Sequence, residues 1–345
     1  MTGGKKSSKT SIARECSTWN IRQTFGDPAL LPTVHAEKKI RRGTGGNRAL
    51  RIPIKFEIPK SKSAPFVIDP SAMLSFDDMR PKALILRTAG SNCDGETAHA
   101  FDLAGASADR VHLNRILESP ARLAEYQILA IPGGFSYGDD IAAGRIFANQ
   151  IMHHLRDFLR KFIDDGKPII GICNGFQVLV KTDLLPGAIA GRTGQTATLT
   201  NNACGRFVDR WIHLSPRSKK CVWTSDIAEL DLPIAHGEGK FVPADESVRR
   251  ALWDNDQVAL VYTRADGSSP QGEYPDNPNG SIDDIAGVTD ESGLVLGLMP
   301  HPERFVSFLN HPNWPNRAAA NEKGAGLNVF INAVRYASNA VGSMI

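Results

Sequence analysis

Cys173 lies in the stretch GICNGFQ (residues 171–177), directly after the strand-like run KPII. Glycines two residues before and two residues after Cys173 match the nucleophile-elbow pattern, in which a strand turns sharply into a helix. The helix N-terminus behind such a turn favours a thiolate, and the amide of Asn174 is placed to donate to a developing oxyanion. The pattern predicts that Cys173 is a nucleophile. The alternative is a small apolar side chain buried in a glycine turn.

A candidate base for this thiol lies near the C-terminus, after the apolar run LVLGLMP. Residues two apart in an extended segment project to the same side, and Pro302 favours extension at His301. Glu303 can therefore orient His301 and stabilise its cation, which leaves the other ring nitrogen for the thiol. Taken separately, His301 could be a core-edge histidine and Glu303 a solvated turn acid. Together with the elbow, they predict a Cys–His–Glu triad.

The glycine-rich stretch PGGFSYGDD follows a third strand-like run. We expect the backbone amides of Gly133 and Gly134 to complete an oxyanion hole at the elbow. A phosphate-binding loop is a weaker alternative, because neither the Walker spacing nor G-x-G-x-x-G is present. Asp139 and Asp140 could be paired acids or metal ligands. We expect them instead to form a turn or a partner-facing surface, and we predict no metal site.

From residue 82 onward, predicted strands alternate with predicted helices, and these elements must position the candidate residues. Four apolar runs predict strands, at 82–87, 108–113, 126–134 and 167–173. Apolar residues at helical spacing predict a helix that ends at Gly166, and its apolar residues are Ile146, Ile151, Leu155, Phe158, Leu159 and Phe162. This alternation predicts an α/β fold with a parallel sheet covered on both faces. Strand-like runs then dominate, at 197–200, 206–214, 221–224, 233–236, 257–263, 284–289 and 293–300, before a closing helix at 326–341.

The basic character of the chain belongs to its N-terminal segment. Residues 1–78 hold 14 Lys and Arg against 7 Asp and Glu, so residues 79–345 carry a net charge of −4 within the overall +3. The main body therefore gives no indication of nucleic-acid binding. Residues 1–78 lack sustained periodicity, so we predict a basic, disordered extension before one domain at 79–345. Met79 is a plausible natural start, and the alternatives for the extension are a transit peptide or a regulatory or nucleic-acid-binding arm.

The five cysteines of this 345-residue chain are scattered and odd in number. That usage suits a reducing compartment better than a disulfide framework, and no C-x-x-C pair indicates zinc. No run approaches the roughly 18 consecutive apolar residues that a membrane span requires. We therefore expect a cytoplasmic protein with no membrane partner.

With PGG, GICNGFQ and MPHPER in this order, the chain resembles the class I glutamine amidotransferases. The stretches GSNCDGET, FSYGDD, GRFVDRW, AHGEGKF and NGSIDDIAGV make it similar, from about residue 79 to the C-terminus, to the glutaminase subunits of phosphoribosylformylglycinamidine synthase. The resemblance implies a three-layer, flavodoxin-like α/β fold, with a mostly parallel central sheet and the elbow at its centre. Ala89 departs from the family, which usually has proline there, and the extension has no family counterpart.

The same resemblance implies how each residue acts. Cys173 would attack the glutamine carboxamide and form a thioester, while Glu303 holds His301, which moves protons and activates water. Gly134 and Asn174 would stabilise the tetrahedral intermediates. The residues implied to contact glutamine are Gln177, Ala235, His236, Gly237 and Glu238. His236 has an ordinary alternative as a histidine at a strand end.

The resemblance also implies partners. The family passes ammonia to a larger synthetase subunit that converts formylglycinamide ribonucleotide to formylglycinamidine ribonucleotide in purine biosynthesis, and many bacteria add a small accessory subunit. ATP and magnesium would belong to that synthetase, and we expect no cofactor in this chain. The FSYGDD, GRFVDRW and SIDDIAGV stretches are candidates for the docking face.

Three other functions compete with this one. A glutaminase for a different synthetase, such as those making GMP or CTP, disagrees with the member-specific loops. A degenerate regulatory subunit would be expected to lose the cysteine, histidine or glutamate, and all three are present. A stand-alone cysteine hydrolase of the wider superfamily often takes its histidine from just after the elbow, where this chain has Asn174.

Overall fold

The computed structural model describes residues 19–23, 34–38, 50–51, 80–189, 191–192, 194–316 and 323–342. The chain divides into two units, Met1–Ala72 and Met73–Ile345. In the first unit, β1 (Trp19–Gln23), β2 (Val34–Lys38) and β3 (Leu50–Arg51) form an antiparallel sheet in that order. The predicted disorder of residues 1–78 otherwise falls outside the described residues and stays a prediction.

The second unit is built on a nine-stranded sheet with the order β10-β9-β12-β13-β14-β7-β6-β4-β5. The strands in chain order are β4 (Lys82–Arg87), β5 (Ser107–His112), β6 (Ile128–Ile131), β7 (Ile169–Ile172), β9 (Val208–Pro216), β10 (Leu230–His236), β12 (Val258–Thr263), β13 (Ile285–Thr289) and β14 (Val295–Leu298). Two further strands, β8 (Ala197–Thr200) and β11 (Lys240–Pro243), pair antiparallel with each other.

One half of the sheet is parallel, and the motifs predicted to be catalytic follow its strands. The neighbours β5, β4, β6, β7 and β14 pair in parallel, while β14, β13, β12, β9 and β10 pair antiparallel. The predicted α/β fold with a parallel core is confirmed, and the strand-rich region after residue 196 supplies the antiparallel half. Because carboxyl ends of parallel strands meet at one edge, the loops after β4, β6, β7 and β14 converge there.

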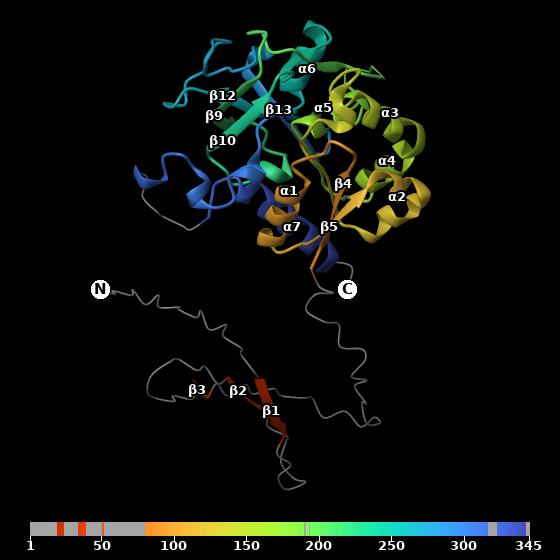
Figure 1. Cartoon of the computed structure of the whole chain (residues 1–345), viewed down its shortest axis with the longest axis vertical. Coiled ribbons are helices and arrows are strands. Elements are labelled where there is room, and N and C mark those ends of the chain that lie inside the picture. The colour runs from red at the N-terminus through yellow and green to blue at the C-terminus, as the bar shows by residue number, and fades with distance from the viewer. Residues whose placement is uncertain are drawn as a thin grey trace, which may run out of the picture. The chain divides into compact units, whose positions relative to one another are not determined.

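Helices cover the sheet in two outer layers. The order of the parallel strands reverses beside β4, and right-handed crossovers therefore place α1 on one face and the helices after β6 and β7 on the other. Helix α1 packs beside α7 (Figure 1). The helices are α1 (Asp94–Ala104), α2 (Leu113–Glu118), α3 (Arg145–His154), α4 (Arg156–Asp164), α5 (Asn174–Lys181), α6 (Glu246–Asp254) and α7 (Leu327–Gly342).

The central strands read as apolar runs because both of their faces are buried. Every residue of β6, β7 and β14 is buried, as expected for a sheet sandwiched between helices. In the described part of the chain, no helix has the length and apolar character to cross a membrane.

Two sequence predictions differ from the structure in detail. The helix predicted to end at Gly166 is two helices, α3 and α4, separated at Leu155, whose φ of −124° is not helical. The break turns Leu155 into the core, where it is fully buried. The strand predicted at 221–224 is instead a short 3-10 helix at Val222–Thr224, whose Trp223 is buried and donates its indole N–H to the carbonyl of Leu294 at 2.8 Å.

The turn between β7 and α5 places Cys173 in a conformation that L-residues rarely adopt, with φ 52° and ψ −104°. Close packing on both sides of the turn requires glycine. A Cβ added to Gly175 would lie 1.9 Å from the carbonyl oxygen of Ile131, and one on Gly171 would lie 2.6 Å from the carbonyl oxygen of Gly175. The predicted elbow geometry is therefore present between a buried strand and a buried helix.

We predict that Gly175→Ala destabilises the protein by about 3 kcal/mol or more, because the new methyl group must displace the backbone of β6. Chemical denaturation measures this change. Gly95→Ala is the matched control, since a Cβ there meets only the Nη1 of Arg110, at 3.7 Å. If Gly175→Ala unfolds at the same denaturant concentration as wild type, α5 does not pack against β6 as described.

Candidate active site

The Cys173 side chain sits at the floor of a cavity, 6% exposed. Its amide donates to the carbonyl of Leu298 on β14 at 2.8 Å, and its Sγ lies 3.8 Å from the carbonyl oxygen of Ala235. Gln177 N–H donates to the carbonyl of Cys173 at 3.1 Å, which begins α5. The thiol therefore lies between the carboxyl end of β14 and the last residues of β10.

His301 and Glu303 form a buried pair beside this thiol. The Nδ1 of His301 lies 2.6 Å from the Oε1 of Glu303, and the two residues are 1% and 2% exposed. Burial opposes the imidazolium, but the carboxylate of Glu303 and then the Cys173 sulfur outweigh it, so the pKa of His301 lies well above its usual range. The Nε2 of His301 has no hydrogen-bond partner among the described residues. That nitrogen is available to a group entering the cavity.

The glycines after β6 serve two different purposes. Gly133 lets the histidine approach, because a Cβ there would lie 2.9 Å from the Cε1 of His301. Two backbone bonds hold the loop, from Phe135 N–H to Gly90 O at 2.9 Å and from Cys93 N–H to Gly133 O at 3.3 Å. The Gly134 N–H takes part in neither bond. Of the two glycine amides expected at the oxyanion hole, Gly134 is the one that also lines the cavity.

The side chain of Asn174 ties the loop after β6 to α5. Its Oδ1 accepts from the Ser136 N–H at 3.3 Å, and its Nδ2 donates to Asp139 at 3.2 Å and to the Oε1 of Gln177 at 2.9 Å. The Nε2 of Gln177 then donates to the Glu238 carbonyl at 2.6 Å. Burial raises the pKa of Asp139, which also accepts from a backbone N–H of its own loop, so this acid organises a turn.

The tautomer of His236 follows from the hydrogen bonds around Asn202. The Nδ2 of Asn202 donates to the carbonyls of Arg206 and His236, at 2.9 and 2.8 Å, so its Oδ1 is the acceptor that receives the Gly239 N–H at 3.1 Å. The Nδ1 of His236, 3.1 Å from that same oxygen, must therefore donate. Burial, and then the charge of nearby His301, lower the pKa of His236 to about 3. The neutral ring leaves Nε2 as a bare acceptor, with no partner among the described residues.

A cavity of about 290 Å³ joins most of the predicted residues. Eight of them line it: Gly134, Cys173, Gln177, Ala235, His236, Gly237, Glu238 and His301. Gly133, Asn174 and Glu303 lie behind this wall and contact its members. The volume suits a small molecule rather than a macromolecular substrate. The wall presents a thiol, both signs of charge and two imidazole nitrogens that bond no other described residue.

Three residues of the site were not predicted from the sequence. Arg304 lines the cavity and donates from Nη2 to the Sγ of Cys93 at 3.1 Å. Cys93, His301 and Glu303 are buried, with one ligand-type atom from each within 4.8 Å of the others. Because the Nδ1 of His301 already bonds Glu303, we do not assign a metal to this cluster, and the absence of a metal stays a prediction. Asn202 sits in a loop with no motif, whereas Cys93 lies in GSNCDGET at the end of β4, a position that the topology alone could have indicated.

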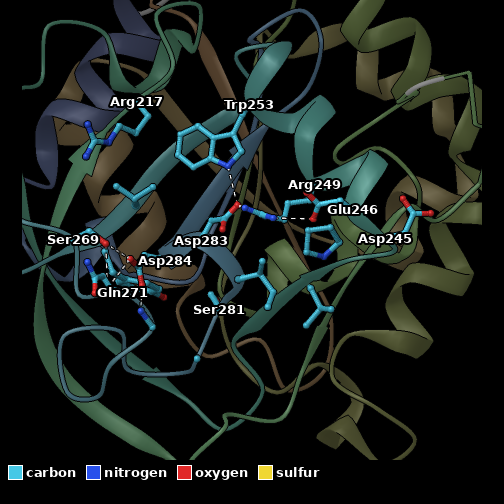
Figure 2. A pocket seen from close by; sticks show the side chains of 17 residues that line it. Arg217, Asp245, Glu246, Arg249, Trp253, Ser269, Gln271, Ser281, Asp283 and Asp284 are labelled. Atoms are coloured by element: carbon cyan, nitrogen blue, oxygen red, sulfur yellow. Dashed lines mark hydrogen bonds and ion pairs between the residues drawn. The ribbon is translucent and has the colours of Figure 1, made fainter.

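A second, larger hollow of about 1080 Å³ lies away from these residues (Figure 2). In it, Asp283 accepts from the Nε of Arg249 at 2.7 Å and from the Trp253 indole at 3.0 Å. Asp284 accepts from Ser269 and from backbone amides of the neighbouring loop. These acids hold the fold together, and no predicted catalytic residue lines the hollow. Residues 285–288 of the SIDDIAGV stretch are buried in β13 and cannot form a docking face.

Comparison with protein families matches residues 80–337 to the CobB/CobQ-like glutamine amidotransferase domain. A phosphoribosylformylglycinamidine synthase subunit PurQ of Dehalococcoides mccartyi is 49% identical over 257 residues, which covers 74% of this chain and 97% of that protein. The protein of the same name from Methanococcus maripaludis is 42% identical over 267 residues, again covering 74% and 97% of the two chains.

The fold has a counterpart among solved structures. A chain of the structure entitled PurLQS from Thermotoga maritima superposes with a TM-score of 0.56 at 31% sequence identity, covering 74% of this chain and 99% of that one. The family match spans residues 80–337, and the relatives and the solved structure each cover 74% of this chain.

We predict that His236 makes stability depend on pH. An unfolded histidine binds a proton near pH 6.5 and the folded one only near pH 3, so stability falls as pH drops below 6.5. At pH 5 the loss amounts to about 2 kcal/mol. The unfolding free energy at pH 5 minus that at pH 7 should therefore be more positive, by about 2 kcal/mol, for His236→Gln than for wild type, because the opposite contribution of His301 is common to both proteins. His99→Gln, which alters an exposed histidine, is the control. An unchanged pH dependence in His236→Gln would mean that the folded ring is protonated at pH 5.

Proposed function

Because this chain belongs to the CobB/CobQ-like glutamine amidotransferases and, within them, to the PurQ subunits of phosphoribosylformylglycinamidine synthase, we propose that its cavity hydrolyses L-glutamine through Cys173. PurQ is the glutaminase subunit of that synthase, an enzyme of purine biosynthesis, and this membership excludes the synthetases making GMP or CTP. The observation that carries the proposal is the unpartnered Nε2 of His301, whose Nδ1 is fixed by Glu303, in the cavity that Cys173 lines.

The first half of the reaction releases ammonia. The Cys173 thiol gives its proton to the Nε2 of His301, and the raised pKa of His301 favours the resulting thiolate–imidazolium pair. The sulfur attacks the carboxamide carbon, and the developing oxyanion accepts hydrogen bonds from the amides of Gly134 and Asn174. His301 then protonates the leaving nitrogen. The C–N bond breaks, and a γ-glutamyl thioester and ammonia remain.

The second half regenerates the thiol. Water enters the place that ammonia left, and His301 takes its proton as the hydroxide attacks the thioester carbon. The same two amides stabilise the second oxyanion. As the C–S bond breaks, glutamate forms and His301 returns the proton to Cys173. Glu303 keeps its charge throughout, since its task is to orient and stabilise the imidazolium.

The other glutamine contacts that we propose lie on the far wall of the cavity. His236 supplies an acceptor, and Gly237 and Glu238 supply backbone amides beside Ala235. Gln177 holds the Glu238 carbonyl and so fixes this wall against α5. A chain of hydrogen bonds thereby links the nucleophile's helix to the segment that meets the substrate.

Ammonia is useful only if it reaches an acceptor before it escapes. We propose that the synthetase subunit docks over the cavity and that the small accessory subunit belongs to the same complex. The synthetase subunit would bind ATP and magnesium, and we place the complex in the cytoplasm. Large apolar side chains are exposed on and near the cavity wall: Phe135 and Phe207 line the cavity and are 49% and 52% exposed, and Ile141, six residues after Phe135, is 69% exposed. Such a patch on a soluble protein is typical of a protein interface.

We expect Cys173→Ala to abolish glutamate release from glutamine, both alone and with the cognate synthetase subunit, because Cys173 is the one described cysteine that stands at the elbow and lines the cavity. The loss should reach about 10⁴-fold or more. Cys204→Ala, which alters an exposed cysteine, should retain wild-type activity. Substantial glutaminase activity in purified Cys173→Ala would overturn the assignment of the nucleophile.

We expect Ile141→Asp to weaken binding of the synthetase subunit by about tenfold or more, because a charge would be buried in the interface. Calorimetric titration of the full chain measures this affinity. The control is Leu103→Asp: Leu103 is 49% exposed but lies near the far end of α1, about 15 Å along the helix from the catalytic edge. Equal affinities for the two variants would argue against docking at the cavity mouth.

A further inference from the structure

Arg304 brings a guanidinium into the cavity wall from the short 3-10 helix that follows His301 (Pro302–Arg304). Among the described residues that line this cavity, it is the one lysine or arginine. Its side chain donates a 3.1 Å hydrogen bond from Nη2 to the Sγ of Cys93. A guanidinium is a rigid fork with five N–H donors, so this single bond leaves most of its donors for other acceptors.

No described carboxylate forms an ion pair with Arg304, although surface arginines elsewhere in the unit do pair with acids. Two acids line the same cavity, Asp139 and Glu238, and neither bonds to it. Asp139 is occupied by Asn174 and by a backbone amide of its own loop. Burial opposes the charge of Arg304, and Cys93 and Glu303 offset that cost. The single bond to Cys93 still leaves most of the guanidinium donors for an anion that arrives with a ligand.

L-glutamine carries one anionic group, its α-carboxylate. We propose that Arg304 binds the α-carboxylate of the substrate and thereby selects free glutamine over other primary amides. The inference rests on the proposed glutaminase function and adds a specificity-determining residue to it. Arginine suits this task because its parallel N–H groups match the two oxygens of a carboxylate.

Cys93 gives Arg304 a fixed position. The sulfur is 1% exposed, and the Cys93 amide is bonded to Gly133 at 3.3 Å, in the loop whose next residue is Gly134. Arg304 is thus anchored to the segment that also carries the proposed oxyanion donor. The carboxylate site and the carbonyl site are therefore set by one rigid group of residues, which fixes where along the glutamine side chain the sulfur must attack.

The test compares two amides in the full complex: L-glutamine and 4-aminobutanamide, which has hydrogen in place of the α-carboxylate. Wild type should prefer glutamine in kcat/KM by about 100-fold or more. Arg304→Gln should lower that preference by about tenfold or more, chiefly through KM for glutamine, with its activity on 4-aminobutanamide little changed. Arg304→Lys keeps the positive charge but not the forked N–H geometry, so its preference for glutamine should lie between those of wild type and Arg304→Gln. Arg115→Gln, on the surface of α2, is the control for loss of a positive charge.

A second measurement does not need turnover. Alkylation of Cys173 by iodoacetate and by iodoacetamide, followed by mass spectrometry, compares an anionic with a neutral reagent of similar size. Arg304→Gln should slow the iodoacetate reaction severalfold relative to the iodoacetamide reaction, while the ratio at exposed Cys204 stays constant.

The outcomes separate the two proposals. If wild type with its synthetase releases no glutamate from glutamine, the proposed function fails, whatever Arg304 does to alkylation. If wild type is active but Arg304→Gln keeps the full preference for glutamine and the wild-type alkylation ratio, Arg304 does not bind the carboxylate. A loss of kcat that is equal for both amides would make Arg304 a structural anchor for Cys93 and would also overturn the inference.

Discussion

Cys173 holds a backbone conformation, φ 52° and ψ −104°, that costs free energy and persists because of what surrounds it. Its amide is bonded to β14, its carbonyl begins α5, and the glycines on either side let β6 and the helix close around it. The position of the sulfur is therefore determined by three strands at once. His301, at the end of β14, reaches the same edge because β14 pairs in parallel with β7.

The two histidines of the site show how the partner, rather than the residue type, decides protonation. Both rings are buried, and burial alone would keep both neutral. His301 faces the carboxylate of Glu303, and its pKa rises. His236 bonds the neutral amide of Asn202, so burial and then the charge of His301 lower its pKa to about 3. One ring is suited to carrying protons and the other to accepting a hydrogen bond. Both histidines line the same cavity, so a charged ring and a neutral ring can contact one small ligand.

Much of the parallel half of the fold, and the Cys–His–Glu arrangement, could be predicted from the sequence, because local patterns encode them. The glycines of the elbow and the His-x-Glu spacing are short-range signals, and apolar runs at 82–87 and 167–173 mark buried strands. Cys93, Arg304 and Asn202 were missed because their contacts join residues distant in the chain. Arg304 and Cys93 are 211 residues apart, and Asn202 and His236 are 34 apart. The break at Leu155 was missed because both helices keep one continuous apolar spacing.

The division of the nine-stranded sheet into a parallel and an antiparallel half separates two tasks. The thiol, its proposed base and the candidate oxyanion donor follow parallel strands, whereas His236 ends β10 at the antiparallel edge and Gly237 and Glu238 follow it. Mutations that accumulate after β10 can alter which amide fits the cavity while the elbow stays intact. Exchanging the segment after β10 would therefore change one wall of the cavity, while the elbow and the proposed carboxylate contact at Arg304, which both follow parallel strands, stay in place.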